Sequence, residues 1–94
     1  MAVGTGTIDF GATPADEAVV TVAGQAGLIS STHIEAWIQQ GDSTADNGVD
    51  EHEEFAALCP FACQWTVDGS FQAKAMPLAM LGIGTFKFHY AWSN

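Results

Sequence analysis

Residues 85–92, TFKFHYAW, alternate large aromatic side chains with smaller or polar ones. Successive side chains of a strand point to opposite faces, so this alternation places four aromatic rings on one face of a strand. The four rings belong to Phe86, Phe88, Tyr90 and Trp92. We expect Lys87, His89 and Ala91 on the opposite face. A strand with four aromatics on one side predicts a compact all-β domain whose core this strand closes.

Shorter segments before this strand have a similar character. Residues 18–23, AVVTVA, are rich in β-branched side chains, and Asp68-Gly69 between two alternating runs is a strong hairpin signal. Residues 31–39 alternate too, although their composition is also compatible with a helix. We expect strands over residues 7–10, 18–23, 31–39, 61–67, 71–76 and 85–92.

The spacing of these segments indicates the fold class. About six short strands, separated by glycine turns every ten to fifteen residues or so, are typical of a β-sandwich. We therefore expect residues 1–94 to form a single domain, a small antiparallel β-sandwich or jelly-roll-like fold. Ninety-four residues, of which 48% are hydrophobic, are enough for one core.

The charge balance excludes several kinds of partner. Eleven acidic residues face two lysines and no arginine, which gives a formal net charge of -9. Binding to phosphate backbones depends on Lys and Arg, so we expect neither nucleic acid nor anionic membrane as a partner. The N-terminus lacks a signal-peptide pattern, and no run of eighteen apolar residues occurs. We therefore expect neither signal-dependent secretion nor a membrane span.

The two cysteines do not form a recognisable motif. Cys59 and Cys63 match neither a C-x-x-C redox motif nor a zinc knuckle. In an extended strand they would lie about 13 Å apart, too far for a disulfide. We expect two buried free thiols, which fits assembly in a reducing cytoplasm.

The most polar segment is residues 41–54, GDSTADNGVDEHEE. We expect it to be a solvated surface loop, with residues 51–58 either a helical turn or the approach to a strand. An EF-hand alignment fails because Ser43 and Ala45 stand where carboxylates are required. A calcium site of another kind remains an alternative there. The histidines lack metal-ligand spacing, so we expect no metal and no cofactor.

Catalytic signatures are also missing from the sequence. It contains no G-x-S-x-G elbow and no phosphate-cradling loop, so we do not expect an enzyme. The candidate residues are instead those for interaction. Trp37 shares a predicted strand face with His33 and Glu35, and an aromatic there either caps the core edge or contacts a partner or a sugar ring. Lys87 and His89 are candidates for contact with a neighbouring copy. Trp65 and Trp92 are expected in the core.

An ordered series of sequence blocks resembles a known group of proteins. The blocks are GTIDFGATP at 6–14, VAGQ at 22–25, HIEAW at 33–37, STAD at 43–46, DEH at 50–52 and GTFKFHYAW at 84–92. In this order they look like short proteins encoded among the virion genes of tailed bacteriophages. The chain departs from that group at 60–67, where the related sequences carry a glycine-rich turn, and at Asn47, where they often carry histidine. The strand order is also distantly similar to the H-type lectin domain, a trimeric sugar-binding sandwich.

The resemblance implies a structural component of a bacteriophage virion, with no activity attached. We expect a capsid decoration or cement protein, or a tail protein, that associates with itself as a trimer or dimer and with other virion proteins. Its expected location is the virion, assembled in the host cytoplasm. The alternative is a carbohydrate- or receptor-binding module on the phage tail, similar to the H-type lectin domain, in which Trp37 and the acidic loop contact the ligand.

Overall fold

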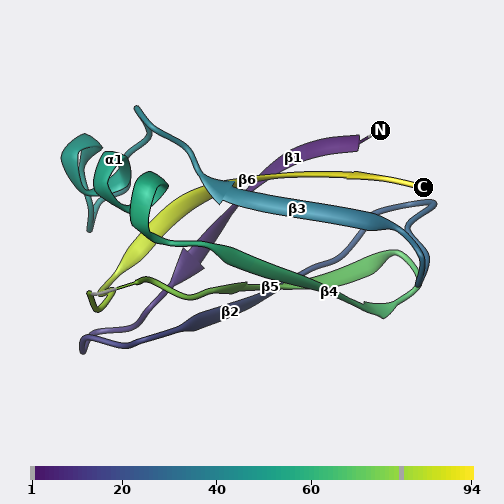
Figure 1. The fold of residues 1–94 in the computed structure, drawn as a ribbon, viewed down its shortest axis with the longest axis horizontal. Coiled ribbons are helices and arrows are strands. Elements are labelled where there is room, and N and C mark those ends of the chain that lie inside the picture. The colour runs from purple at the N-terminus through teal and green to yellow at the C-terminus, as the bar shows by residue number, and fades with distance from the viewer. Residues whose placement is uncertain (1, 79) are drawn as a thin grey trace.

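The computed structural model describes residues 2–78 and 80–94, which form six strands and one helix (Figure 1). The strands are β1 (Ala2–Asp9), β2 (Ala18–Val22), β3 (His33–Ile38), β4 (Phe61–Val67), β5 (Ser70–Ala75) and β6 (Thr85–Ser93). The helix is α1 (Val49–Leu58), between β3 and β4. Five of the six predicted strands lie within two residues of their observed ends, and β1 is the exception.

The strands form two three-stranded antiparallel sheets. The order is β1-β6-β3 in the first sheet and β2-β5-β4 in the second. Figure 1 shows the two sheets packed as layers, with α1 across one end and both termini at the other. The predicted antiparallel β-sandwich is confirmed. The helix is the one departure from an all-β architecture within the described residues.

The strand β6 lies in the middle of the first sheet and supplies most of its core face. Its burial alternates as predicted, with Phe86, Phe88, Tyr90 and Trp92 buried. The polar tips of two of these rings share one partner. Trp92 Nε1–H donates to Gln25 Oε1 at 3.0 Å, and Gln25 Nε2–H donates to the Tyr90 hydroxyl at 3.1 Å. Gln25 therefore lets two polar aromatics pack in the core without an unsatisfied group.

β1 begins earlier than the predicted strand at 7–10, because two glycines that look like strand breakers are required there. Gly4 pairs with Tyr90 and Gly6 pairs with Phe88, and both aromatic rings lie over the glycines. A Cβ at Gly6 would stand 2.7 Å from Phe88 Cζ, and a Cβ at Gly4 would overlap the Tyr90 hydroxyl. Glycine in a strand often marks such a close approach.

The segment 41–54 is not the solvated loop that its composition predicts. α1 starts inside it at Val49, and His52 is 0% exposed. His52 Nδ1–H donates to the Gly48 carbonyl at 3.0 Å, and His52 Nε2 accepts the Lys87 N–H at 3.0 Å. These partners define which nitrogen carries the proton, because a carbonyl only accepts and an N–H only donates. Of the two predicted alternatives for residues 51–58, the helix is confirmed.

The residues just before α1 hold the start of β6 in place. Asp46 Oδ2 accepts hydrogen bonds from both the backbone N–H and the hydroxyl of Thr85, at 3.0 and 2.8 Å. Thr44 Oγ1 and Asn47 Nδ2 both donate to the Thr85 carbonyl at 2.8 Å. Gly84 has a φ of +73°, and a Cβ at this position would stand 2.7 Å from Asp46 Cβ, which is too close. This polar segment is therefore a structural clamp on β6, and its polar composition reflects specific hydrogen bonds.

Two predictions about burial need correction. Trp65 is 38% exposed and lies outside the core, on the edge strand β4, where the register shifts between Trp65 and Val67. Its indole N–H donates to Asp68 Oδ1 at 3.2 Å. Cys59 and Cys63 are free thiols as predicted, but only Cys59 is fully buried. Burial raises the pKa of each thiol from the ordinary 9.0 to about 11.

Candidate functional site

The outer face of the β1-β6-β3 sheet carries all five predicted interaction residues. On β3 these are His33, Glu35 and Trp37, and on β6 they are Lys87 and His89. The antiparallel register sets Trp37 directly opposite His89. Side chains on alternate positions of paired strands share one face, so the five residues form one surface.

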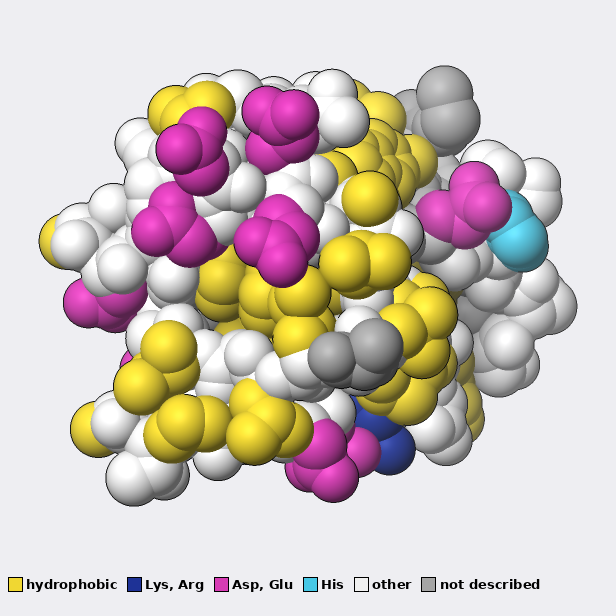
Figure 2. All heavy atoms as spheres, turned by 60° about the vertical axis from the view of Figure 1, so that its left-hand side comes forward, with side chains coloured by type: hydrophobic (Ala, Val, Ile, Leu, Met, Phe, Trp, Pro, Cys, Tyr) yellow, Lys and Arg dark blue, Asp and Glu magenta, His cyan; other side chains and the backbone are white. Residues whose placement is uncertain are grey.

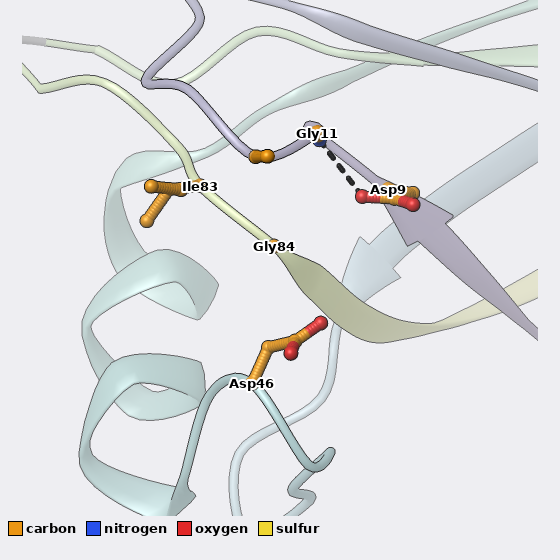
Figure 3. A pocket seen from close by; sticks show the side chains of 6 residues that line it. Asp9, Gly11, Asp46, Ile83 and Gly84 are labelled. Atoms are coloured by element: carbon orange, nitrogen blue, oxygen red, sulfur yellow. Dashed lines mark hydrogen bonds between the residues drawn. The ribbon is translucent and has the colours of Figure 1, made fainter.

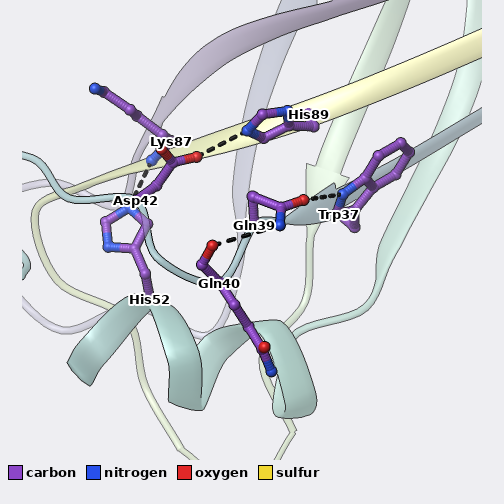
Figure 4. A network of polar contacts seen from close by, with 7 residues as sticks. All are labelled: Trp37, Gln39, Gln40, Asp42, His52, Lys87 and His89. Atoms are coloured by element: carbon purple, nitrogen blue, oxygen red, sulfur yellow. Dashed lines mark hydrogen bonds and ion pairs between the residues drawn. The ribbon is translucent and has the colours of Figure 1, made fainter. Parts of the chain in front are cut away.

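Trp37 and His89 form the centre of a cluster with Gln39 and Asp42, shown in Figure 4. The two rings are stacked, with centroids 6.2 Å apart and planes 20° from parallel. His89 Nε2 lies 2.8 Å from Asp42 Oδ2 and donates to it, because a carboxylate oxygen only accepts. Trp37 Nε1–H donates to Gln39 Oε1 at 3.0 Å. We call these four residues the Trp37 cluster.

The remaining candidates lie beside this cluster. His33 Nε2 is 3.7 Å from Glu35 Oε1, and both side chains are largely in water, where such a pair contributes little to stability. The Lys87 side chain is exposed, and no described residue forms an ion pair with it. Its backbone N–H holds His52, so Lys87 connects the outer face to the buried histidine behind it.

The alternation over residues 31–39 places Gln39 on the same face as Trp37, as the structure has it. The sequence did not indicate Asp42. Asp42 is one of several carboxylates in the stretch 41–54, and its role depends on a histidine 47 positions later. The sequence carries no local signal for that pairing.

A second feature is an open hollow of about 450 Å³ at the end of β1, shown in Figure 3. Its walls include Asp9, Asp46, Ile83 and Gly84. Asp9 Oδ1 accepts the Gly11 N–H at 2.8 Å, and Asp46 already binds Thr85. The two carboxylates are therefore engaged in holding the backbone around the hollow.

The described residues contain neither a metal-binding cluster nor a membrane-spanning helix. Within residues 2–78 and 80–94, no group of three or more His, Cys, Asp and Glu side chains lies close enough to hold a metal ion. No helix in that part of the chain is long and apolar enough to span a membrane. Every buried side-chain nitrogen and oxygen of the described residues has a hydrogen-bond partner.

Comparison of the chain with protein-family models, with curated proteins and with solved structures found no match. The evidence for a function therefore comes from the chain itself. The Trp37 cluster is partly exposed and is held by hydrogen bonds from Trp37 to Gln39 and from His89 to Asp42. An aromatic platform with a polar surround is suited to contact with another surface or with the face of a sugar ring.

Proposed function

We propose that this chain is a structural, non-enzymatic protein of a bacteriophage virion. It serves as a capsid decoration or cement protein, or as a tail-associated protein, that binds copies of itself and other virion proteins. The ordered sequence blocks that resemble phage virion proteins support this proposal. So does the construction of the sandwich, whose polar groups are used for internal support and whose first sheet leaves an edge strand open.

The open edge of β1 is the observation that carries the proposal. β1 pairs only with β6, and no other described residue makes a backbone hydrogen bond to it. The first seven residues of β1 contain no charge, no proline and no bulge, although native edge strands normally carry such protection. The other edges are less suited to pairing: β2 is five residues long, β3 carries Glu35, and β4 is bulged.

Pairing of β1 with the same strand of a second copy would extend both first sheets into one. An antiparallel pair of identical strands has two-fold symmetry, so this contact produces a dimer. A trimer would require β1 to pair with a different edge of the next copy. Sedimentation velocity distinguishes the two assemblies by mass.

A pair of matched variants tests this edge. Thr5→Lys places a charge in the middle of β1, and Thr21→Lys places the same charge on the edge strand β2. We expect Thr5→Lys to shift the protein to the monomer and Thr21→Lys to leave its assembly unchanged. Equal assembly of the two variants would exclude the β1 edge as the contact.

The virion role itself is tested on particles. Purified protein is added to mature phage particles from which this protein has been removed. Stoichiometric rebinding with a gain in heat resistance supports a decoration or cement role, and no rebinding contradicts it. The copy number per particle separates the two locations, because hundreds of copies indicate the capsid and a small multiple of three or six indicates the tail.

A carbohydrate-binding role is the second candidate, favoured by the 40% exposure of Trp37 beside His89 and Asp42. Trp65 is a matched control, since it is 38% exposed and its indole N–H is likewise held by a nearby side chain. If the module binds host glycans, Trp37→Ala abolishes binding on a glycan array and Trp65→Ala does not. Equal binding by both variants would remove this candidate.

A further inference from the structure

A groove lies at the α1 end of the sandwich, on a different surface from the Trp37 cluster. The connection from β5 to β6 runs beside α1: the Leu78 N–H donates to the Leu58 carbonyl at 2.7 Å, and Asn47 Nδ2–H donates to the Ile83 carbonyl at 2.9 Å. These two bonds hold the connection along the helix from its last turn to its first. The groove between them has a volume of about 260 Å³.

Apolar side chains form the floor and one wall of this groove. Phe55 of α1 and Phe86 of β6 are buried and stacked, with centroids 4.2 Å apart, and they form the floor. Leu81 and Ile83 form the wall and are 58% and 46% exposed. Further exposed apolar residues on the same two segments are Val49, Leu58 and Leu78. The floor therefore belongs to the core, whereas the wall presents apolar surface to the solvent.

Carboxylates border the apolar surface. Figure 2 shows acidic side chains beside the hydrophobic ones on this end of the molecule. Glu51 and Glu54 line the groove from α1, and Asp50 and Glu53 lie on the same helix. All four are exposed, and none forms an ion pair with a described residue. A ligand in this groove would therefore meet apolar contacts in the middle and negative charge on the helix side.

The groove favours one kind of occupant. Its volume is below the roughly 300–1,000 Å³ of small-molecule sites, and it suits a few anchoring side chains of a peptide segment. A second copy of this chain is a weaker match, because the chain has no arginine and only two lysines. Lys74 lies 3.8 Å from Glu17, so Lys87 alone of the two lysines has no ion pair with a described residue and could face the four carboxylates of α1. A partner complementary to the helix carboxylates must carry the positive charge itself.

We infer that this groove docks an apolar segment of another protein, with Lys or Arg residues flanking the apolar side chains. The apolar residues of that segment pack on Leu81, Ile83 and the Phe55 ring, and its basic residues pair with Glu51 and Glu54. The inference rests on the proposed function only in taking the partner to be another virion component. The chemistry of the partner follows from the groove itself.

A synthetic probe tests the groove directly. The probe is a twelve-residue amphipathic peptide with leucines on one face and lysines on the other, and its control has glutamates in place of the lysines. We expect the lysine peptide to perturb the amide resonances of Glu51, Glu54, Leu81 and Ile83, and the glutamate peptide to perturb none. Absence of these shifts up to about 1 mM lysine peptide would overturn the inference, as would shifts centred on the sheet faces.

Variants separate the apolar and charged contributions. Leu81→Ser with Ile83→Ser removes the wall, and we expect loss of peptide binding, whereas Val19→Ser on β2, which is 45% exposed, leaves binding unchanged. The double variant Glu51→Gln, Glu54→Gln is expected to weaken binding about tenfold and to reduce its salt dependence. A thermal melt of each variant establishes that it is folded. Unchanged binding by both groove variants contradicts the inference, and loss of self-association by the same variants would assign the groove to a second copy.

The outcome is distinguishable from that of the virion proposal. If particles bind the groove variants as well as the unmodified protein, the groove is not the docking site but the virion role stands. If the lysine peptide binds in the groove but stripped particles do not take up the protein, the groove is a docking site and the virion role fails.

Discussion

The two sheets of the sandwich contribute core side chains of very different size. The first sheet supplies four aromatic rings from β6 alone, whereas the second supplies one buried phenylalanine and three buried alanines, Ala18, Ala73 and Ala75. Large residues on one inner face opposite small ones on the other let two layers interdigitate. The packing of the core therefore depends on the large aromatic side chains of β6 and equally on the small alanines of β2 and β5, which leave room for them.

Two phenylalanines of the second sheet lie where they meet rings of the first. Phe71 of β5 contacts Tyr90 edge-on at 5.2 Å between centroids, and Phe61 of β4 lies 5.5 Å from Phe88. Such geometries add to the stabilisation from burial. The difference between the sheets shows that neither inner face can be altered in size without affecting the other, and the following predictions test this dependence.

The largest effect is expected from removing a ring of the first sheet. Phe88 is 0% exposed, so Phe88→Ala should lower the free energy of unfolding by about 3–5 kcal/mol through lost burial and the cavity left behind. Lys87→Ala, its neighbour on the outer face, should have almost no effect. Urea denaturation followed by tryptophan fluorescence measures both. Similar stability of the two variants would refute the assignment of faces on β6.

The next effect is expected from enlarging a residue of the second sheet. Ala73→Leu adds volume to a fully buried site and should cost about 1–3 kcal/mol, because a well-packed core resists overpacking. Gln72→Leu, on the opposite face of β5, is the control and should be tolerated. A stable Ala73→Leu protein with unchanged unfolding cooperativity would mean that the small half of the core is not tightly packed.

A smaller effect is expected within the first sheet. Replacing glycine by alanine in a strand usually stabilises, but at Gly6 the new methyl group would meet the Phe88 ring, so Gly6→Ala should cost about 1 kcal/mol. In a Phe88→Leu background the same change should cost much less. A double-mutant cycle by urea denaturation measures this coupling. Additive effects would show that the ring does not occupy the space above Gly6.

The effect that is smallest at neutral pH, and that appears only in alkaline solution, is expected from the two thiols near the second sheet. Burial raises the pKa of Cys59 and Cys63 to about 11, against 9.0 in the ordinary state. Between these values the unfolded chain releases protons that the folded chain keeps, so their contribution to stability is complete below pH 9 and declines from pH 9 to 11. The melting temperature of the Cys59→Ala, Cys63→Ala variant should fall less steeply over this interval. If the melting temperatures of this variant and of the unmodified protein fall equally between pH 9 and 11, the thiols do not contribute to the loss of stability.

Local alternation was sufficient to predict most of the sheet structure. The faces of β3 and β6 and the hairpin of β4 and β5 follow from side chains two positions apart, and the structure has them as predicted. The start of β1 could not be predicted in this way. Gly4 and Gly6 fit a strand only because rings more than eighty positions later occupy the space above them.

The helix α1 was obscured by its composition. Its acidic residues suggested a solvated loop, but His52, Phe55, Ala56 and Cys59 recur at helical spacing and are the residues that face the core. That spacing was the available signal. No sequence pattern indicates the clamp around Thr85, because Asp46 differs from the neighbouring carboxylates only in its hydrogen bond to a strand 39 positions away.

The candidate site was predicted only in part, because it too depends on contacts between residues far apart in the sequence. Trp37 and His89 lie on predicted strands, so their faces followed from the sequence, but their contact depends on the pairing of β3 with β6. The groove beside α1 lies between two segments that no periodic pattern brings together. The sequence indicated a helical turn over residues 51–58 as one of two alternatives, but nothing in it placed the connection from β5 to β6 beside that segment.

The position of β6 between β1 and β3 constrains the order in which the molecule folds. All eight residue pairs between β1 and β6 join positions separated by most of the chain. The hairpin of β4 and β5 can form early because it closes a short loop, but the first sheet has no central strand until β6 has left the ribosome. Until then β1, whose first seven residues carry no charge, has no partner strand in its sheet. Between the synthesis of β1 and that of β6, the edge of β1 is therefore open to pairing with strands of other chains.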